Sequence, residues 1–234
     1  QESLTKTVIQ DFNLLSKLEA LKQIHFPDSK VLLERAKFRL KFEELFFVQL
    51  RLLRSNLIRH QITQGFVFGK VGDVFNNFYN HHLPFQLTNA QKRVVKEIRV
   101  DMGSGKQMSR LVQGDVGSGK TLVALLSMLL AIDNGFQACL MAPTEILAKQ
   151  HFATISELVE PLGLQVALLT GSSKTKARRE LHQNLELGVI NILIGTHALI
   201  EDVVVFKNLG LVIIDEQHRF GVEQRGKMHK KNTQ

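Results

Sequence analysis

The residues with the clearest chemical meaning form the segment Gly114-Asp-Val-Gly-Ser-Gly-Lys120-Thr121. It follows the apolar run SRLVQ and precedes the helix-forming stretch LVALLSMLLAI, which gives the order strand, glycine loop, helix. Glycines let backbone N–H groups turn toward phosphate oxygens, and a helix N-terminus adds partial positive charge. In this pattern Lys120 would reach the β- and γ-phosphates, and the Thr121 hydroxyl would bind magnesium. The sequence therefore predicts a nucleotide phosphate site. Its expected residues are Gly114, Asp115, Val116, Gly117, Ser118, Gly119, Lys120 and Thr121.

A second glycine-lysine sequence, Gly103-Ser-Gly-Lys106, lies shortly before this loop. It has Val100 where the loop pattern needs its first glycine, and Gln107 where the pattern needs a hydroxyl group. The flanking order of strand and helix is also missing. We predict that this second segment is a surface turn that closes a helix.

A pair of carboxylates follows the apolar run Leu211-Val-Ile-Ile214, in the tetrapeptide Asp215-Glu-Gln-His218. A strand that is buried on both faces delivers the residue after it to the carboxyl edge of the sheet, where open α/β folds bind their ligands. Asp215 would hold magnesium through water, and Glu216 would orient or deprotonate the attacking water. The alternative is a strand end with two solvated acids. The candidate catalytic residues are Lys120, Asp215, Glu216, Gln217 and His218.

The chain beyond residue 83 alternates between short β-rich apolar runs and amphipathic segments. This alternation is typical of βα units around a parallel sheet. We predict an α/β domain over residues 83–234 with a central, mostly parallel sheet. The expected strands contain the runs SRLVQ, QACLMAP, LQVALLT, VINILIG and LGLVIID.

Residues 1–82 have a different texture, and we predict an α-helical connector region. Apolar residues recur there at helical spacing, and Phe26-Pro27 interrupts them once, which predicts two helices. The second, over roughly 29–56, is apolar on more than one face, so we expect residues such as Leu50 to be buried against a larger body or a partner. Residues 60–84 show no clear periodicity and are expected to be an irregular connector.

Composition narrows the classes of protein that remain. With 44% hydrophobic and 22% charged residues, the chain is an ordinary globular one and not a disordered one. No apolar run has the length of a membrane helix, so we expect a cytoplasmic protein. The single cysteine, Cys139, excludes an intramolecular disulfide and a cysteine-based zinc site. The formal net charge of +8 favours a polyanionic partner.

These motifs together resemble the motor domain of superfamily 2 helicases, and more closely the RecG family of bacterial ATP-dependent DNA helicases. The resemblance is carried by GDVGSGKT at 114–121, MAPTEILAKQH at 141–151, LTGSSK at 169–174, IGTHALI at 194–200 and VIIDEQHRFGVEQR at 212–225. It implies that residues 83–234 are the first RecA-like motor lobe, incomplete at its C-terminal end, with ATP and Mg²⁺ as cofactors. The transcription-repair coupling translocases are the nearest alternative family, and Ser118 and His218 favour the RecG family over them.

The resemblance also assigns an adenine site to the segment Leu83-Pro-Phe-Gln-Leu-Thr-Asn-Ala-Gln91. Gln91 would read the adenine edge, and Phe85 would either stack on the ring or pack below it. From the residues alone, Thr88 is equally well explained as the N-cap of the following helix.

Nucleic-acid contacts are implied for segments that follow three of the expected strands. Short side chains and free backbone amides there suit contact with a sugar-phosphate backbone. Thr144 is also explained as a helix N-cap, and His197 and His218 lack the neighbours that a zinc site needs. The implied contact residues are Pro143, Thr144, Gln150, His151, Thr170, Gly171, Ser172, Gly195, Thr196 and His197.

Two further segments have open interpretations. The basic residues Lys174, Lys176, Arg178 and Arg179 form either a nucleic-acid contact or a solvated helix face. Arg219-Phe-Gly221 resembles a loop that couples strand binding to the ATP site, although Phe220 would also suit a core.

The expected function is that of an ATP-dependent DNA helicase lobe, in a chain that begins at Gln1 without a methionine and reads as a fragment. The implied partners are branched or double-stranded DNA, and a wedge domain and second motor lobe that complete a monomeric enzyme. Without the second lobe we expect weak Mg-ATP binding and little hydrolysis. The alternative from another class is an ATP-binding switch or scaffold that binds a protein partner through its helical region.

Overall fold

The computed structural model describes residues 1–62, 64–173, 175–228 and 231. The chain divides into two compact units, residues 1–63 and 64–234, and each is described by itself. We expected the boundary at residue 82, and the structure places residues 64–82 with the second unit. The reason is packing, because Phe68 and the fully buried Phe78 belong to the core of that unit.

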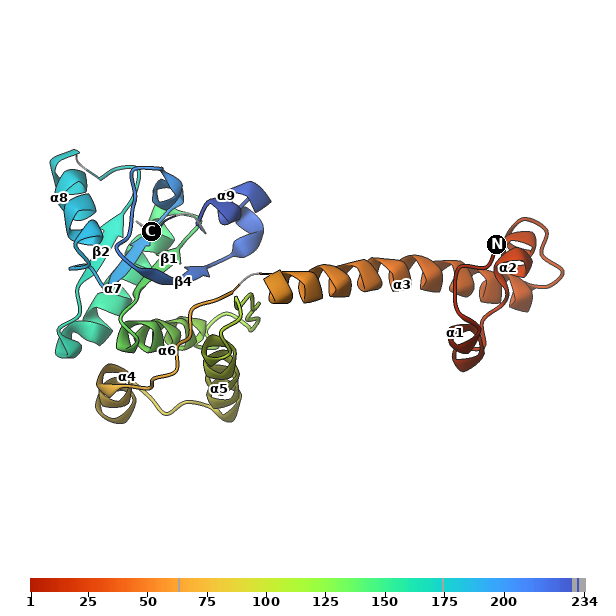
Figure 1. Cartoon of the computed structure of the whole chain (residues 1–234), viewed down its shortest axis with the longest axis horizontal. Coiled ribbons are helices and arrows are strands. Elements are labelled where there is room, and N and C mark those ends of the chain that lie inside the picture. The colour runs from red at the N-terminus through yellow and green to blue at the C-terminus, as the bar shows by residue number, and fades with distance from the viewer. Residues whose placement is uncertain (63, 174, 229–230, 232–234) are drawn as a thin grey trace. The chain divides into compact units, whose positions relative to one another are not determined.

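The first unit is helical, as predicted, but it contains more helices than expected (Figure 1). Asn13 has a left-handed backbone with φ 46°, which ends the first helix, and Ser16 starts the next by accepting a hydrogen bond from the Glu19 amide. Leu15, Ala20 and Ala36 form the small core. The helices are α1 (Lys6–Asp11), α2 (Lys17–His25) and α3 (Lys30–Ile62).

Most of α3 lies outside this small core. Its predicted range of 29–56 was close to the observed one, but the expected burial is not found within the described residues. Leu50 is 48% exposed and Leu53 is 59% exposed, whereas Ala36 and Arg39 near the start of the helix are fully buried. The apolar surface of α3 therefore has no cover within this unit.

A buried charge network holds the first unit together at Arg39. Its guanidinium donates to the Leu15 carbonyl at 3.0 Å, to Glu43 at 2.5 Å and to Glu2 at 2.6 Å. Lys17 donates to the other oxygen of Glu43 at 2.8 Å. Burial raises the pKa of Glu43, but hydrogen bonds from Lys17, Ser3 and Arg39 outweigh it and lower that pKa to about 2.

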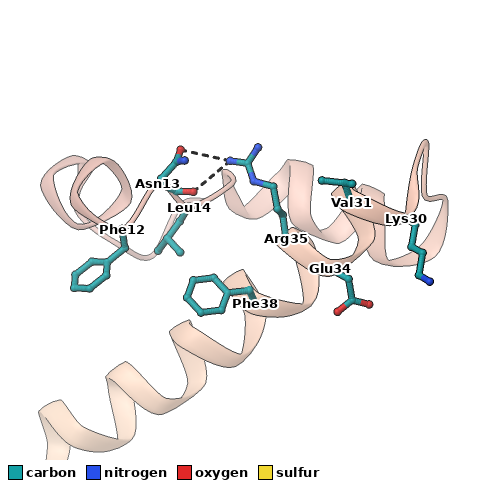
Figure 2. Close-up of a pocket in the computed structure, with 8 residues that line it drawn as sticks. All are labelled: Phe12, Asn13, Leu14, Lys30, Val31, Glu34, Arg35 and Phe38. Carbon is teal, nitrogen blue, oxygen red and sulfur yellow. Dashed lines mark hydrogen bonds between the residues drawn. The ribbon is translucent and has the colours of Figure 1, made fainter.

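An open groove of about 560 Å³ lies between the start of α3 and the segment after α1 (Figure 2). Phe12 and Phe38 line it and are more than half exposed. Arg35 crosses from α3 and donates to the Asn13 carbonyl at 3.2 Å. The groove is thus apolar along its aromatic side and polar where Arg35 ties the two segments.

The second unit contains a parallel sheet with helices, so the predicted α/β class is confirmed (Figure 1). The strand order is β2-β3-β1-β4, and every pairing is parallel. Cys139 in the middle of β1 lies opposite Leu193 of β3 and Val212 of β4. The strands are β1 (Gln137–Met141), β2 (Val166–Leu169), β3 (Ile192–Gly195) and β4 (Leu209–Ile214).

Both faces of this sheet are covered, which explains why its strands read as continuous apolar runs. One face, with Leu140 and Ile194, packs against α6 and α7, and α5 packs on α6 in the same core. The other, with Cys139 and Leu193, packs against residues of α8 and the segment 198–206. The helices of this unit are α4 (Asp73–Asn77), α5 (Asn89–Gly103), α6 (Lys120–Asp133), α7 (Glu145–Val159), α8 (Thr175–Glu186) and α9 (Val222–Lys227), with the short helical turns η1 (Phe78–His82), η2 (Glu160–Leu162), η3 (His197–Ile200) and η4 (Gln217–Arg219).

The strand predicted for the run SRLVQ is not formed. Residues 109–113 lie within the described chain and have no regular secondary structure there, and Leu111 is 59% exposed. Arg110 instead binds Glu97 at 2.7 Å and Asp101 at 2.6 Å, both on α5. This segment is therefore tied to a helix and not to the edge of the sheet.

The segment expected to be an irregular connector, 60–84, is partly helical. α4 is held at its start by the Asp133 carboxylate, which accepts hydrogen bonds from the amides of Gly72, Val74 and Phe75 at 2.9–3.1 Å. A turn of π-helix, η1, follows directly. By contrast, the turn predicted at Gly103–Lys106 is confirmed, because α5 ends there and Gly105 has φ 71°.

Candidate nucleotide and nucleic-acid site

The phosphate-loop segment lies at the head of α6. Gly119 has φ 77° and occupies the N-cap position, and Gly117 has φ 80°, a backbone region that strongly favours glycine. The Lys120 ammonium donates to the carbonyls of Gly114 at 2.7 Å and Asp115 at 2.8 Å. The lysine thus lies over the loop, at the first turn of α6.

Two of the glycines in this loop lie close to the ends of neighbouring side chains. A Cβ atom on Gly114 would lie 2.7 Å from the Ser118 hydroxyl, and one on Gly119 would lie 2.4 Å from Nε2 of Gln91. Val116, at the tip of the loop, is fully exposed. The loop therefore combines a tightly packed base with an open tip.

Gln91 connects the proposed adenine segment to the phosphate loop. Its Nε2 donates to the Ser118 carbonyl at 2.9 Å, and its Oε1 accepts from the Thr88 amide at 2.8 Å. Thr88 in turn accepts from the Gln91 amide, so the predicted N-cap is present as a capping box. Phe85 is 54% exposed.

Asp215 follows β4, and its carboxylate is held from two sides. Its amide donates to the Met141 carbonyl at 2.9 Å, which extends the β1–β4 ladder by one residue. Oδ2 lies 2.9 Å from Nε2 of His151 on α7, and Oδ1 accepts from the Glu216 amide at 3.0 Å. The carboxylate is therefore fixed in orientation but still partly exposed, at 30% of its side chain.

Glu216 has a left-handed backbone with φ 48°, which is uncommon for a residue with a side chain. Its carboxylate lies 3.4 Å from Nε2 of His218, and both side chains are largely exposed. Glu216 and His218 thus lie together on the surface, directly beside the carboxyl end of β4.

Helix α7 starts in the segment assigned to nucleic acid. Thr144 is its N-cap and accepts from the Leu147 amide at 3.2 Å, as predicted. Glu145 accepts from the amide of Ser172 at 3.1 Å and from its hydroxyl at 2.9 Å. The hydrogen bond from the Ser172 hydroxyl holds the pKa of Glu145 below its usual value. The segments 143–151 and 170–172 are therefore brought together at one edge.

Other residues assigned to nucleic acid are not at the surface. Thr170 and Thr196 are 2% and 1% exposed, and Thr196 Oγ1 has no hydrogen-bond partner among the described residues. A Cβ atom on Gly195 would lie 2.1 Å from the Leu169 carbonyl oxygen, so this glycine is required by the approach of β2. His197 is exposed. Packing therefore explains Thr170, Gly195 and Thr196, while Gly171, Ser172 and His197 remain accessible.

The two segments with open interpretations differ in outcome. Arg178 pairs with Glu201 at 2.8 Å, and Lys174 lies outside the described residues. Arg219 is exposed, whereas Phe220 is 8% exposed and belongs to the core with β4. The core interpretation of Phe220 is thus the one that its packing supports.

The contacts of His151 and Glu145 were not predicted. The sequence motif assigned His151 to nucleic acid, and no spacing along the chain relates it to Asp215, which is 64 positions away. Gln150, its neighbour, is exposed. Only the packing of α7 against the sheet brings these side chains together.

The oxygen donors of Thr121 and Asp215 are of the kind that magnesium prefers. Within the described residues, no cluster of three or more His, Cys, Asp or Glu could hold a metal ion by protein ligands alone. Among the helices that the structure describes, none is long and apolar enough to span a membrane.

Comparison with known proteins gives consistent results. The family model of the DEAD/DEAH box helicases matches residues 88–233. The ATP-dependent DNA helicase RecG of Synechocystis sp. is 47% identical over 97% of this chain, which spans 27% of that protein. The RecG of Bacillus subtilis is 46% identical over 98% of the chain, which spans 34% of it.

A solved structure of RecG bound to a three-way DNA junction is similar in fold. Its TM-score is 0.81 and its identity 44%, over 94% of this chain and 30% of that one. The resemblance to RecG is thus confirmed. This chain spans about a third of the length of these relatives. The chain belongs to the DEAD/DEAH box helicase family.

Proposed function

We propose that residues 83–234 form the first motor lobe of a RecG-like DNA helicase, which couples ATP hydrolysis to branch migration and fork reversal in recombination and repair. The observation that carries this proposal is the shared location of its two nucleotide motifs. Residues 134–136 join α6 to β1, so α6 runs back along the sheet and its N-terminus faces the carboxyl edge. The Asp215–Glu216 pair follows β4 at the same edge.

The proposed chemistry divides among these residues by charge. Lys120 would exchange its contacts with the Gly114 and Asp115 carbonyls for the β- and γ-phosphates, and the α6 amides would bind the same oxygens. Thr121 and Asp215 would hold Mg²⁺, which neutralises charge on the transferred phosphate. Glu216 would accept a proton from the attacking water, with Gln217 and His218 beside it. The segment with Gln91 and the exposed Phe85 would receive the adenine.

The proposed DNA contacts lie at the same edge of the sheet. Pro143, Thr144 and Gln150 at the start of α7, together with Gly171, Ser172 and His197, would contact the backbone of a strand. The helix N-terminus suits a phosphate group, and the net charge of +8 suits a polyanion. Because Thr170, Gly195 and Thr196 are buried, they would shape this surface and not touch the strand.

Family membership implies ATP binding, whereas the movement of DNA belongs to the whole protein. We propose that a wedge domain and a second lobe complete the enzyme, and that this chain alone hydrolyses ATP slowly because the catalytic groups of the second lobe are missing. In related phosphoryl transfer, an arginine finger alone contributes about 10³ to 10⁵ in rate.

The test is ATP hydrolysis by the complete helicase without DNA, with linear duplex and with a model fork, at several salt concentrations. We expect strong stimulation by the fork, lost in Lys120→Ala and in Glu216→Gln. An ATPase that ignores DNA would contradict the motor and favour the switch or scaffold with a protein partner. Stimulation by duplex without preference for the fork would instead favour the transcription-repair coupling class.

A further inference from the structure

Helix α7 makes one contact to each half of the proposed site. At its first residue, Glu145 binds the amide and hydroxyl of Ser172, in the segment proposed to contact DNA. Further along the same helix, His151 lies 2.9 Å from Asp215, the proposed magnesium ligand. A single rigid element therefore touches both the strand-binding segment and the metal-binding carboxylate.

The contact between His151 and Asp215 is partly shielded from water. The His151 side chain is 16% exposed and that of Asp215 is 30% exposed. Hydrogen bonds in such surroundings are stronger than bonds at an open surface, because the local dielectric constant is lower. Since Glu216 donates its amide to the other oxygen, both oxygens of Asp215 have a hydrogen-bond partner among the described residues.

Carboxylates that bind metals depend on such partners. A hydrogen bond to one oxygen fixes the rotamer of the carboxylate and directs its remaining lone pairs, and loss of such a partner usually costs 10- to 100-fold in metal affinity or activity. His151 is the side chain from another element that supplies this bond to Asp215. Its neutral ring needs only its Nε2–H to do so.

We propose that His151 is a positioning residue for Asp215, and that through it α7 links the strand-contacting segment to the magnesium site. The proposal deepens the proposed function and rests on it, since it takes Asp215 as a magnesium ligand. His151 then acts inside the lobe and does not touch DNA. Displacement of the start of α7 by a bound strand would change the orientation of Asp215 and so the affinity for Mg-nucleotide.

The test uses the complete helicase and five variants. His151→Phe keeps a ring of similar size but removes the donor, and His151→Gln restores an N–H at the same distance from the backbone. Asp215→Asn removes the proposed ligand, alone and combined with His151→Phe. Glu157→Gln, at an exposed position of the same helix, is the matched control.

The readout is the binding of a fluorescent ADP, measured without turnover as Mg²⁺ is titrated. We expect the Mg²⁺ concentration for half-maximal binding to rise by about 10- to 100-fold in His151→Phe. It should return to within a few-fold of wild type in His151→Gln and stay unchanged in Glu157→Gln. Binding of the nucleotide without Mg²⁺ should be equal in all of these proteins, which also reports that the phosphate loop is folded.

Three results would overturn the proposal. One is a half-saturation within twofold of wild type in His151→Phe. Another is an equal loss in His151→Gln. The third is a His151→Phe substitution that raises the Mg²⁺ concentration for half-maximal binding as much in Asp215→Asn as in the wild type. A residue that acts through Asp215 should have no such effect once Asp215 is replaced. The wild-type measurement separates the proposed magnesium site from the proposed role of His151. If nucleotide binding by the wild type did not depend on Mg²⁺, the proposed function itself would be contradicted.

Discussion

Replacement of Arg39 by methionine should unfold the first unit locally. Arg39 is fully buried and donates to Glu2, Glu43 and the Leu15 carbonyl. Methionine keeps an apolar stem but has no donor, so Glu43, whose side chain is only 14% exposed, would lose Arg39 and keep its bonds from Lys17 and Ser3. The segment before α2 would also lose its anchor at Leu15.

The magnitude follows from the burial of this network. Removal of one partner of a buried ion pair costs about 3–5 kcal/mol when the other charge is left without compensation. Because Lys17 stays on Glu43, we place the loss of that pair at the low end of this range, and the lost bonds to Glu2 and to the Leu15 carbonyl add to it. A cost of about 3–5 kcal/mol corresponds to roughly 10²- to 5 × 10³-fold in a local unfolding equilibrium. A unit of about 60 residues is marginally stable as a whole, so this loss approaches its total stability.

Hydrogen exchange with mass spectrometry measures this opening in peptides from α2 and the first half of α3. We expect protection there to fall by at least about 10²-fold or to the level of an unfolded chain. Protection of β1 and β3 should not change, because Leu15, Glu43 and Glu2, to which Arg39 donates, all belong to the first unit. The matched control is Arg35→Met, since Arg35 is exposed on the same helix and its loss should cost under about 1 kcal/mol.

A second substitution tests the cause. Combining Arg39→Met with Glu43→Leu removes the buried carboxylate that has lost Arg39 and takes a partner only from the more exposed Lys17, so we expect part of the lost protection to return. A threefold or smaller loss of protection in Arg39→Met would refute the reasoning. So would a double variant that is more damaged than the single one.

The other predictions concern single contacts of the two units. Glu43 has a folded pKa of about 2 against an ordinary value of 4.5, so its contribution to the stability of the first unit is complete above about pH 4.5 and is lost as the pH falls toward 2. The melting temperature of α2 and α3 should therefore fall over this pH window. A Glu43→Gln protein that melts with the same pH dependence as the wild type would contradict this prediction. Gly195→Ala forces a Cβ against the Leu169 carbonyl and should destabilise the second unit by about 1–3 kcal/mol in denaturant titrations, whereas Gly69→Ala, with open space around it, should have little effect. Asp133→Ala leaves the amides at the start of α4 without their acceptor and should cost about 1–3 kcal/mol of stability. This cost should appear as faster amide hydrogen exchange in α4. Unchanged exchange there would contradict the prediction and show that water replaces the carboxylate.

Much of the fold and of the nucleotide site could be predicted, because the signals are local. The phosphate loop is recognised by glycine at fixed spacing, and Gly117 and Gly119 of that loop have a left-handed backbone. The order of apolar runs predicted β1 to β4 and a parallel sheet, since strands buried on both faces read as continuous apolar segments. Thr88 and Thr144 were predicted as N-caps from the residues that follow them.

The features that were missed depend on contacts between distant segments. The run SRLVQ has strand-like residues, but the pairing of Arg110 with α5 decides its conformation. Residues 64–82 show no hydrophobic periodicity in the sequence. Their structure depends instead on hydrogen bonds to Asp133 and on the burial of Phe78. The contact between His151 and Asp215 likewise follows from how α7 packs on the sheet.

The central claim is that ATP bound at residues 114–121 drives the movement of branched DNA. The most direct measurement is the conversion of a labelled model fork into its annealed products by the complete helicase, with ATP, without ATP, and with Lys120→Ala. We predict ATP-dependent conversion by the wild type and none by the variant, because Lys120 supplies the cation for the phosphates at the head of α6. Undiminished conversion by Lys120→Ala, or conversion without ATP, would contradict the account.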